Sequence, residues 1–368
     1  MLATFFVVSA LVSCATTPVT APADALRADL ETRLAGAGLD ASVEVPFALT
    51  PTTRAEVVGQ LRPTGDDASR VARVVDYIFS DLDLRYALTP TRDAEQVYRQ
   101  REGNCLSFVN LFVALGRYMQ LAPFFVEVED YQRWDHRRGM VVSRGHVVGG
   151  VYVGGALRTF DFLPYRPKGY RTLRPIDDIV AVAHFRNNLG AEALLTGDLD
   201  LAAEHLEVAV ALAPRLIDAL NNLAVLRARR GDDEEAVSLY RRALEVESGH
   251  VPVLENLGRL LERMGRRDEA AAVAERVASA RRASPFFFLS KAEVALADGD
   301  AGGALELLRQ ALSRDAEIPR LHVGLTKTYL ALGEIDKARH HLARARALDA
   351  DGDEVRRLTL LLGGVGVE

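Results

Sequence analysis

Three side chains in the middle of the sequence have the chemistry that a thiol-based reaction needs: Cys105, His146 and Asp161. Cys105 follows Gly103–Asn104, and the apolar residues after it recur at intervals of four, which predicts a buried helix from Cys105 to about Met119. The first turn of a helix carries free N–H groups and the positive end of the helix dipole. A thiol at that position is stabilised as a thiolate, and the N–H groups could bind an oxyanion.

His146 and Asp161 are expected on neighbouring strands. Runs rich in β-branched and aromatic residues predict strands at 124–128, 146–153 and 157–162. Gly154–Gly155 predicts a hairpin turn, and His146 and Asp161 lie at similar distances along the chain from it. The histidine could then take the thiol proton, and the aspartate could orient the imidazole ring. The alternative is that Cys105 is a small buried hydrophobic residue without a catalytic role.

The blocks around these side chains resemble a known superfamily. They are Gly103–Phe108, Gly145–Val148 and Thr159–Phe162, and residues 66–165 as a whole resemble the transglutaminase-like superfamily of papain-like fold. The resemblance implies an α+β domain over 26–180, with Cys105, His146 and Asp161 as a triad that acts on peptide or protein amide bonds.

Two residues depart from that family's pattern. Leu106 and Val148 stand where many relatives have an aromatic residue, which concerns the substrate groove rather than the triad. A separate alternative is a degenerate, non-catalytic domain that keeps the three residues by descent.

The second half of the sequence repeats with a period of 34 residues over 183–352. Small residues recur where two helices would pack closely, and glycines end the first helix of each repeat: Gly197, Gly231, Gly265, Gly299 and Gly333. The pattern resembles five tetratricopeptide repeats, which implies an all-α solenoid that binds a partner protein or peptide in a groove. The alternative is that the array only shapes or dimerises the neighbouring domain. Residues 353–368 are expected to form a capping helix and a tail, and at least two of Phe286, Phe287 and Phe288 are expected in the core.

The N-terminus is typical of an exported protein. Residues 1–13 form a short apolar stretch that predicts a signal peptide, although no Lys or Arg precedes it, and 14–25 is a Thr/Pro/Ala-rich tether. Leu11–Cys14 resembles a bacterial lipobox, which implies acylation of Cys14 and attachment to a membrane. We therefore expect a lipoprotein of the cell envelope, on the periplasmic side of the outer membrane.

The composition argues against several other classes of protein. The net charge is -6 and no basic tail is present, so nucleic acid is not an expected partner. The two cysteines cannot form a disulfide-rich scaffold. No histidine pair combines metal-ligand spacing with carboxylate support, and the adjacent His340 and His341 would not face one site on a helix, so we expect neither metal nor cofactor. His136 is flanked by charged residues and is expected in a solvated loop.

Together these patterns predict a lipid-anchored thiol enzyme of the transglutaminase-like class, whose repeats recruit its protein substrate or an envelope partner. The second interpretation is a non-catalytic envelope scaffold in which both domains bind partners. The sequence does not distinguish hydrolysis from acyl transfer to an amine.

Overall fold

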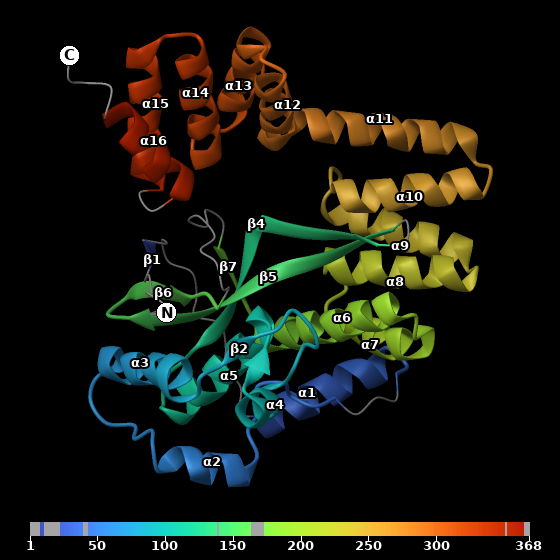
Figure 1. The fold of residues 1–368 in the computed structure, drawn as a ribbon. Coiled ribbons are helices and arrows are strands. Elements are labelled where there is room, and N and C mark those ends of the chain that lie inside the picture. Colours follow the sequence, from blue (N-terminus) through green and yellow to red (C-terminus); the bar gives the residue numbers. More distant parts are fainter. Residues whose placement is uncertain are drawn as a thin grey trace. The chain divides into compact units, whose positions relative to one another are not determined.

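The computed structural model describes residues 8–10, 23–39, 43–137, 140–162, 173–349 and 352–363. The chain divides into two compact units, Met1–Arg267 and Asp268–Glu368, and we describe each by itself (Figure 1).

The first unit begins with helices and a short parallel strand pair. The helices are α1 (Ala23–Gly36), α2 (Pro51–Val58), α3 (Asp67–Asp76), the π-helical turn Tyr77–Asp81, α4 (Ala94–Gln100) and α5 (Cys105–Tyr118). The strands β2 (Arg85–Tyr86) and β3 (Glu102–Gly103) pair just before α5. The expected helix after Gly103–Asn104 is thereby confirmed, and every residue from Leu106 to Gly116 is buried.

An antiparallel sheet follows, with strand order β1-β6-β5-β4-β7. Its strands are β1 (Val8–Ala10), β4 (Phe124–Arg137), β5 (Met140–Val153), β6 (Ala156–Phe160) and β7 (Leu173–Ile176). Gly154 and Gly155 have φ of +59° and +80°, as a two-residue hairpin turn requires, so the turn expected between β5 and β6 is confirmed. Strand β1 lies inside the segment predicted to be a signal peptide, and whether that segment is removed stays a prediction.

Strands β4 and β5 are longer than the sequence indicated. After an irregularity between Val128 and Arg133 the two strands continue as a ribbon, and His136 pairs with Val141. The expectation of a loop at His136 was wrong. The charged residues around it favour a loop locally, but β4 and β5 pair with each other there as a hairpin. Strand β5 lies against helices α8 (Ile217–Arg230) and α10 (Val251–Arg263).

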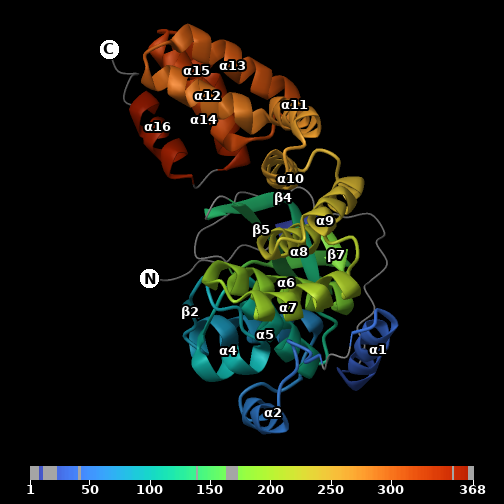
Figure 2. The same cartoon turned by 90° about the vertical axis from the view of Figure 1, so that its right-hand side faces the viewer.

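The first repeat is part of the same core as the sheet and helix α5. Helix α6 (Asp178–Thr196) starts directly after β7, with Asp177 as its N-cap, and α7 (Leu199–Leu212) follows it. Val182, Phe185 and Leu212 share one apolar cluster with Phe112 of α5. Figures 1 and 2 both place α6 and α7 between α4 and the next pair, α8 and α9 (Asp233–Val246).

The second unit is helical. Helix α11 (Arg267–Ala283) starts at the boundary, and the following helices are α12 (Pro285–Ala297), α13 (Ala301–Arg314), α14 (Pro319–Ala331), α15 (Ile335–Leu348) and α16 (Asp353–Gly363). Phe288 is buried and Phe287 packs against the same core, whereas Phe286 is 57% exposed, so the expectation for these three residues is confirmed.

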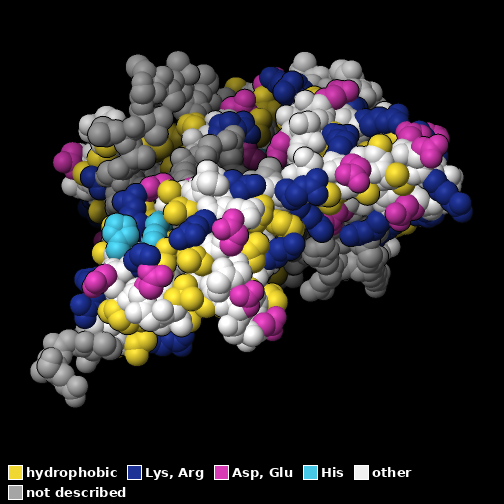
Figure 3. Space-filling model, turned by 90° about the horizontal axis from the view of Figure 1, so that it is seen from above, with side chains coloured by type: hydrophobic (Ala, Val, Ile, Leu, Met, Phe, Trp, Pro, Cys, Tyr) yellow, Lys and Arg dark blue, Asp and Glu magenta, His cyan; other side chains and the backbone are white. Residues whose placement is uncertain are grey.

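Figure 3 shows one face of the molecule, on which basic and acidic side chains are interspersed.

The five glycines of the 34-residue period all have positive φ, between 74° and 92°, at the ends of α6, α8, α10, α12 and α14. This left-handed conformation ends a helix at little cost only when the residue is glycine. The expected role of these glycines, to end the first helix of each repeat, is therefore confirmed. Among the residues that the structure describes, no helix is long and apolar enough to span a bilayer.

Candidate functional site

The candidate nucleophile, Cys105, is the first residue of α5 and is half-buried. Asn104 caps this helix: its backbone is extended, and its Oδ1 accepts hydrogen bonds from the Ser107 N–H at 3.0 Å and from the Ser107 hydroxyl at 2.9 Å. An N-cap satisfies one of the free N–H groups of a helix start and fixes where the first turn begins. The position of the Cys105 thiol therefore depends on Asn104.

His146 and Asp161 are brought together by the register of the sheet. Gly149 of β5 pairs with Phe160 of β6, so Asp161, one residue further, lies on the same face as His146 and diagonal to it. The His146 Nε2 lies 3.1 Å from Asp161 Oδ2, and His146 is 2% exposed. The Cys105 thiol is a second neighbour of the same ring, near enough to raise its pKa. The structure thus brings all three sequence-predicted residues to one place.

The electrostatics favour a protonated imidazole. Burial alone would disfavour the charged ring, but the hydrogen bonds with Asp161 and Cys105 outweigh it and raise the pKa of His146 to about 9. An imidazolium beside a thiol is the arrangement that activates a cysteine nucleophile and later protonates a leaving amine.

Two glycines allow the close packing that this geometry needs. A Cβ atom at Gly149 would lie 2.6 Å from the Phe112 ring, so only glycine lets α5 approach strand β5. A Cβ at Gly103 would lie 2.6 Å from the Ser107 Cβ, directly before the N-cap. The contact at Gly149 joins the helix that carries the thiol to the strand that carries the imidazole, and the contact at Gly103 lets the chain enter that helix closely.

The loop 88–93 supports the N-cap from behind. The Thr91 hydroxyl oxygen accepts a hydrogen bond from the Asn104 Nδ2 at 2.7 Å, and the Arg92 N–H donates to Ser107 Oγ at 2.8 Å. Thr91, Asn104 and Ser107 are all buried. Nothing in the local sequence pattern pointed to Thr91, because it lies 13 residues before the N-cap that it contacts.

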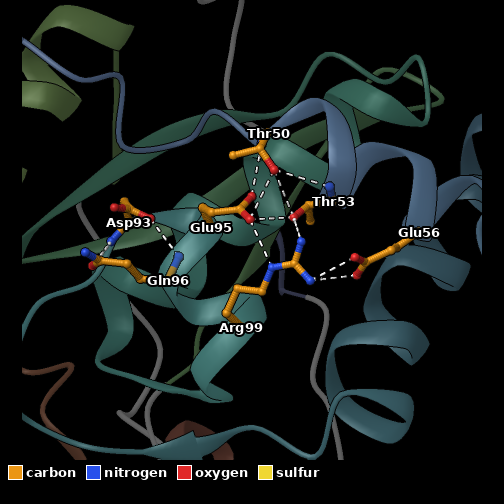
Figure 4. A network of polar contacts seen from close by, with 7 residues as sticks. All are labelled: Thr50, Thr53, Glu56, Asp93, Glu95, Gln96 and Arg99. Atoms are coloured by element: carbon orange, nitrogen blue, oxygen red, sulfur yellow. Dashed lines mark hydrogen bonds and ion pairs between the residues drawn. The ribbon is translucent and has the colours of Figure 1, made fainter.

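Helix α4 continues from this loop and is tied to α2 by a polar network (Figure 4). Asp93 and Gln96 form a capping box at the start of α4. Glu95 accepts hydrogen bonds from the Thr50 N–H at 3.0 Å and the Thr53 hydroxyl at 2.5 Å. Burial disfavours the Glu95 carboxylate, but these hydrogen bonds prevail and lower its pKa. The C-terminal side of the loop is thereby fixed.

A cavity of about 360 Å³ lies on the other side of this loop. Its walls include Thr91 and Arg92 from the loop, Phe185 and Arg186 from α6, and His205 from α7. Cys105, His146 and Asp161 do not line it, so the geometry of the three side chains, and not this cavity, marks the candidate site.

Comparison with protein families agrees with both halves of the fold. The model of the transglutaminase-like superfamily matches residues 55–161, which contain all three candidate residues. Models of the tetratricopeptide repeat match 215–283, 255–319 and 295–361. The chain carries a transglutaminase-like domain followed by tetratricopeptide repeats. The first helical pair, α6 and α7, precedes the matched repeats and has the same helix–glycine–helix form.

The relatives found by sequence are shorter matches. Photosystem I assembly protein Ycf3 of Prochlorococcus marinus (strain NATL2A) is 29% identical over 102 residues, which are 27% of this chain and 59% of that protein. The protein of the same name from Parasynechococcus marenigrum (strain WH8102) is 33% identical over 89 residues, 23% of this chain and 50% of that protein. The chain therefore spans between half and three fifths of these curated relatives.

Solved structures resemble about half of the chain. The crystal structure of MamA has 14% sequence identity and a TM-score of 0.26, and covers 50% of this chain and 96% of its own. Pseudomonas aeruginosa pilF has 22% sequence identity and a TM-score of 0.28, and covers 50% of this chain and 83% of its own.

Other candidate residues fall elsewhere. Cys14, the predicted lipidation site, lies outside the described residues. Within the described ranges, no group of three or more His, Cys, Asp and Glu side chains could hold a metal ion. His341 contacts His322 of the preceding helix, Nδ1 to Nδ1 at 3.0 Å, and its ring also lies edge-on to that of His340, with the ring centroids 5.1 Å apart.

Proposed function

We propose that the chain is a thiol enzyme of the transglutaminase-like class that acts on amide bonds of a peptide or protein. The observation that supports this most directly is the His146 ring, buried between Asp161 and the Cys105 thiol at the start of a helix. Helix start, acid–base group and orienting carboxylate are the parts that nucleophilic acyl transfer needs.

The reaction would proceed in two steps, acylation of Cys105 and then transfer of the acyl group. The Cys105 thiolate attacks the amide carbonyl carbon and forms a C–S bond, while the N–H groups of the first turn of α5 stabilise the oxyanion. The C–N bond then breaks, and the His146 imidazolium gives its proton to the leaving amine. In the second step water or another amine attacks the thioester, gives a proton to His146, and releases the Cys105 thiolate.

An activity probe tests the proposal. A thiol-directed acylating probe should label the wild-type chain, and neither Cys105→Ala nor His146→Ala should be labelled at a comparable rate. With a small amide substrate, product analysis with and without added primary amine separates hydrolysis from acyl transfer. Equal labelling of wild type and His146→Ala would refute the acid–base role of His146.

We further propose that the protein is exported and anchored by acyl chains on Cys14, as the lipobox-like residues Leu11–Cys14 indicate. Two or more acyl chains anchor a protein stably in a membrane. Cells given labelled palmitate should incorporate label into the wild-type chain and not into Cys14→Ser. Label that persists in Cys14→Ser would refute lipidation at this residue.

The second candidate is a non-catalytic scaffold that brings partner proteins together. Tetratricopeptide repeats bind proteins, and the curated relatives carry the name of an assembly protein. A scaffold would retain its biological role in Cys105→Ala, whereas the enzyme would lose it.

A further inference from the structure

A chain of hydrogen bonds leads from the first repeat to the N-cap of the candidate nucleophile's helix. Glu192, on α6, accepts hydrogen bonds from the Thr91 N–H at 2.9 Å and from the Thr91 hydroxyl at 2.7 Å, both at Oε1. Its second oxygen lies 3.1 Å from the same N–H. Thr91 in turn accepts from Asn104, and Asn104 caps α5.

The direction of each hydrogen bond follows from the chemistry of Glu192. An ionised carboxylate only accepts, so the single proton of the Thr91 hydroxyl points to Glu192. The Thr91 oxygen is then left as an acceptor, and it faces the amide NH₂ of Asn104. This orientation of the amide directs Oδ1 toward the Ser107 N–H, which is the orientation that an N-cap requires.

The loop 88–93 borders a cavity, so the hydrogen bonds with Glu192 help to hold it in place. The cavity of about 360 Å³ separates parts of residues 90–93 from α6 and α7, so apolar contact fixes the loop incompletely on that side. The carboxylate of Glu192 crosses from α6 to this loop and holds Thr91 at both its N–H and its hydroxyl. Interactions with an ionised group are stronger than those between neutral groups.

We propose that Glu192 is a positioning residue, which orients Cys105 through Thr91 and Asn104 and so makes the first repeat part of the site. Its effect on turnover rests on the proposed function, but its effect on the reactivity of the Cys105 thiol does not. Glu192 then adds a hydrogen-bonded link between the first repeat and the reaction centre to the apolar core that they already share.

The test compares Glu192→Ala and Thr91→Val with the control Glu207→Ala in the full chain. Glu207 lies on α7 and pairs with Arg227 at 2.7 Å, so the control removes a glutamate ion pair of the same repeat without contact to Thr91. Alkylation by iodoacetamide at pH 7 is followed by mass spectrometry of the tryptic peptide 102–117, which contains Cys105. Circular dichroism establishes that each variant is folded.

We expect Glu192→Ala and Thr91→Val to slow alkylation about fivefold, the size of effect expected from the loss of one helix N-cap, and the control to change it less than about twofold. With a small amide, kcat should fall while KM stays the same, and Glu192→Gln, which keeps one acceptor oxygen, should recover part of the loss. Should Glu192→Ala fail to fold, Thr91→Val, which removes only a hydroxyl, gives the same readout.

Wild-type alkylation rates in both folded variants would overturn the proposal, as would equal slowing in Glu207→Ala. If the wild type turns over no amide but alkylation still slows in both variants, the proposed function fails and the positioning role stands.

Discussion

At the scale of single residues, the His146 ring combines two opposing effects. Burial disfavours its positive charge, and the neighbouring Asp161 and Cys105 favour it and prevail. A histidine that is protonated at neutral pH can donate that proton directly to a leaving amine. The Asp161 side chain is 20% exposed, so it orients the ring from the edge of the site.

The pH dependence of activity should report this ring. The imidazolium is present below its pKa and is lost above it, so kcat/KM of the wild type should fall as pH rises through about 9. Asp161→Asn removes the charged acceptor, which should move this fall to lower pH and reduce kcat/KM by about 10²–10⁴-fold. The profile is measured between pH 5 and 10.5 with a small amide. A basic limb at the same pH in both proteins would contradict the role of Asp161.

At the scale of elements, the site depends on how closely α5 lies against β5. The thiol and the imidazole are on different elements, and the contact between Phe112 and Gly149 sets their separation. The N-cap side is fixed separately, by the loop 88–93 and by the network that ties α4 to α2. Strand β5 and helix α5 therefore have to pack correctly before the three residues can meet.

Gly149→Ala should disturb this packing. The added methyl would lie 2.6 Å from the Phe112 ring, so we expect a loss of about 1–3 kcal/mol of stability and reduced labelling of Cys105. The matched control is Gly36→Ala, because a Cβ there would meet no atom within 4 Å. Phe112→Leu in the Gly149→Ala background should restore part of the labelling. Stability is measured by denaturant unfolding, and an unchanged midpoint for Gly149→Ala would refute the packing argument.

At the scale of the whole molecule, the boundary between compact units does not coincide with the start of the repeats. The first unit runs to Arg267 and includes α6 to α10, and α6 and α7 share the apolar core of the sheet. Asp178 at the start of α6 also forms an ion pair with Arg117 of α5 at 2.6 Å. The first repeats therefore complete the transglutaminase-like domain structurally.

Two fragments test this organisation. Fragment 22–182 lacks most of α6 and should expose the apolar surface that Phe185 and Leu212 cover, so we expect aggregation or loss of cooperative unfolding. Fragment 22–267 retains the whole unit after the predicted signal segment and should be soluble and unfold cooperatively. Size-exclusion chromatography and thermal unfolding monitored by circular dichroism compare the two. A soluble, cooperatively unfolding 22–182 would contradict the shared core.

The sequence determined the features that depend on local pattern. The helix start at Cys105, the Gly154–Gly155 turn and the 34-residue period each arise from residues close together in the chain, so they were predicted correctly. The approach of His146 to Asp161 was also predictable, because a two-residue turn fixes the strand register, and the resemblance implied that Cys105 joins them.

Only the tertiary structure decided the long-range contacts. Glu192 lies 101 residues from Thr91, and no periodicity connects them. The contacts of strand β5 with α8 and α10 likewise join segments that lie far apart in the sequence. Such contacts satisfy hydrogen bonds and bury surface between distant segments, and the free energy that selects them is a property of the assembled core rather than of any local stretch.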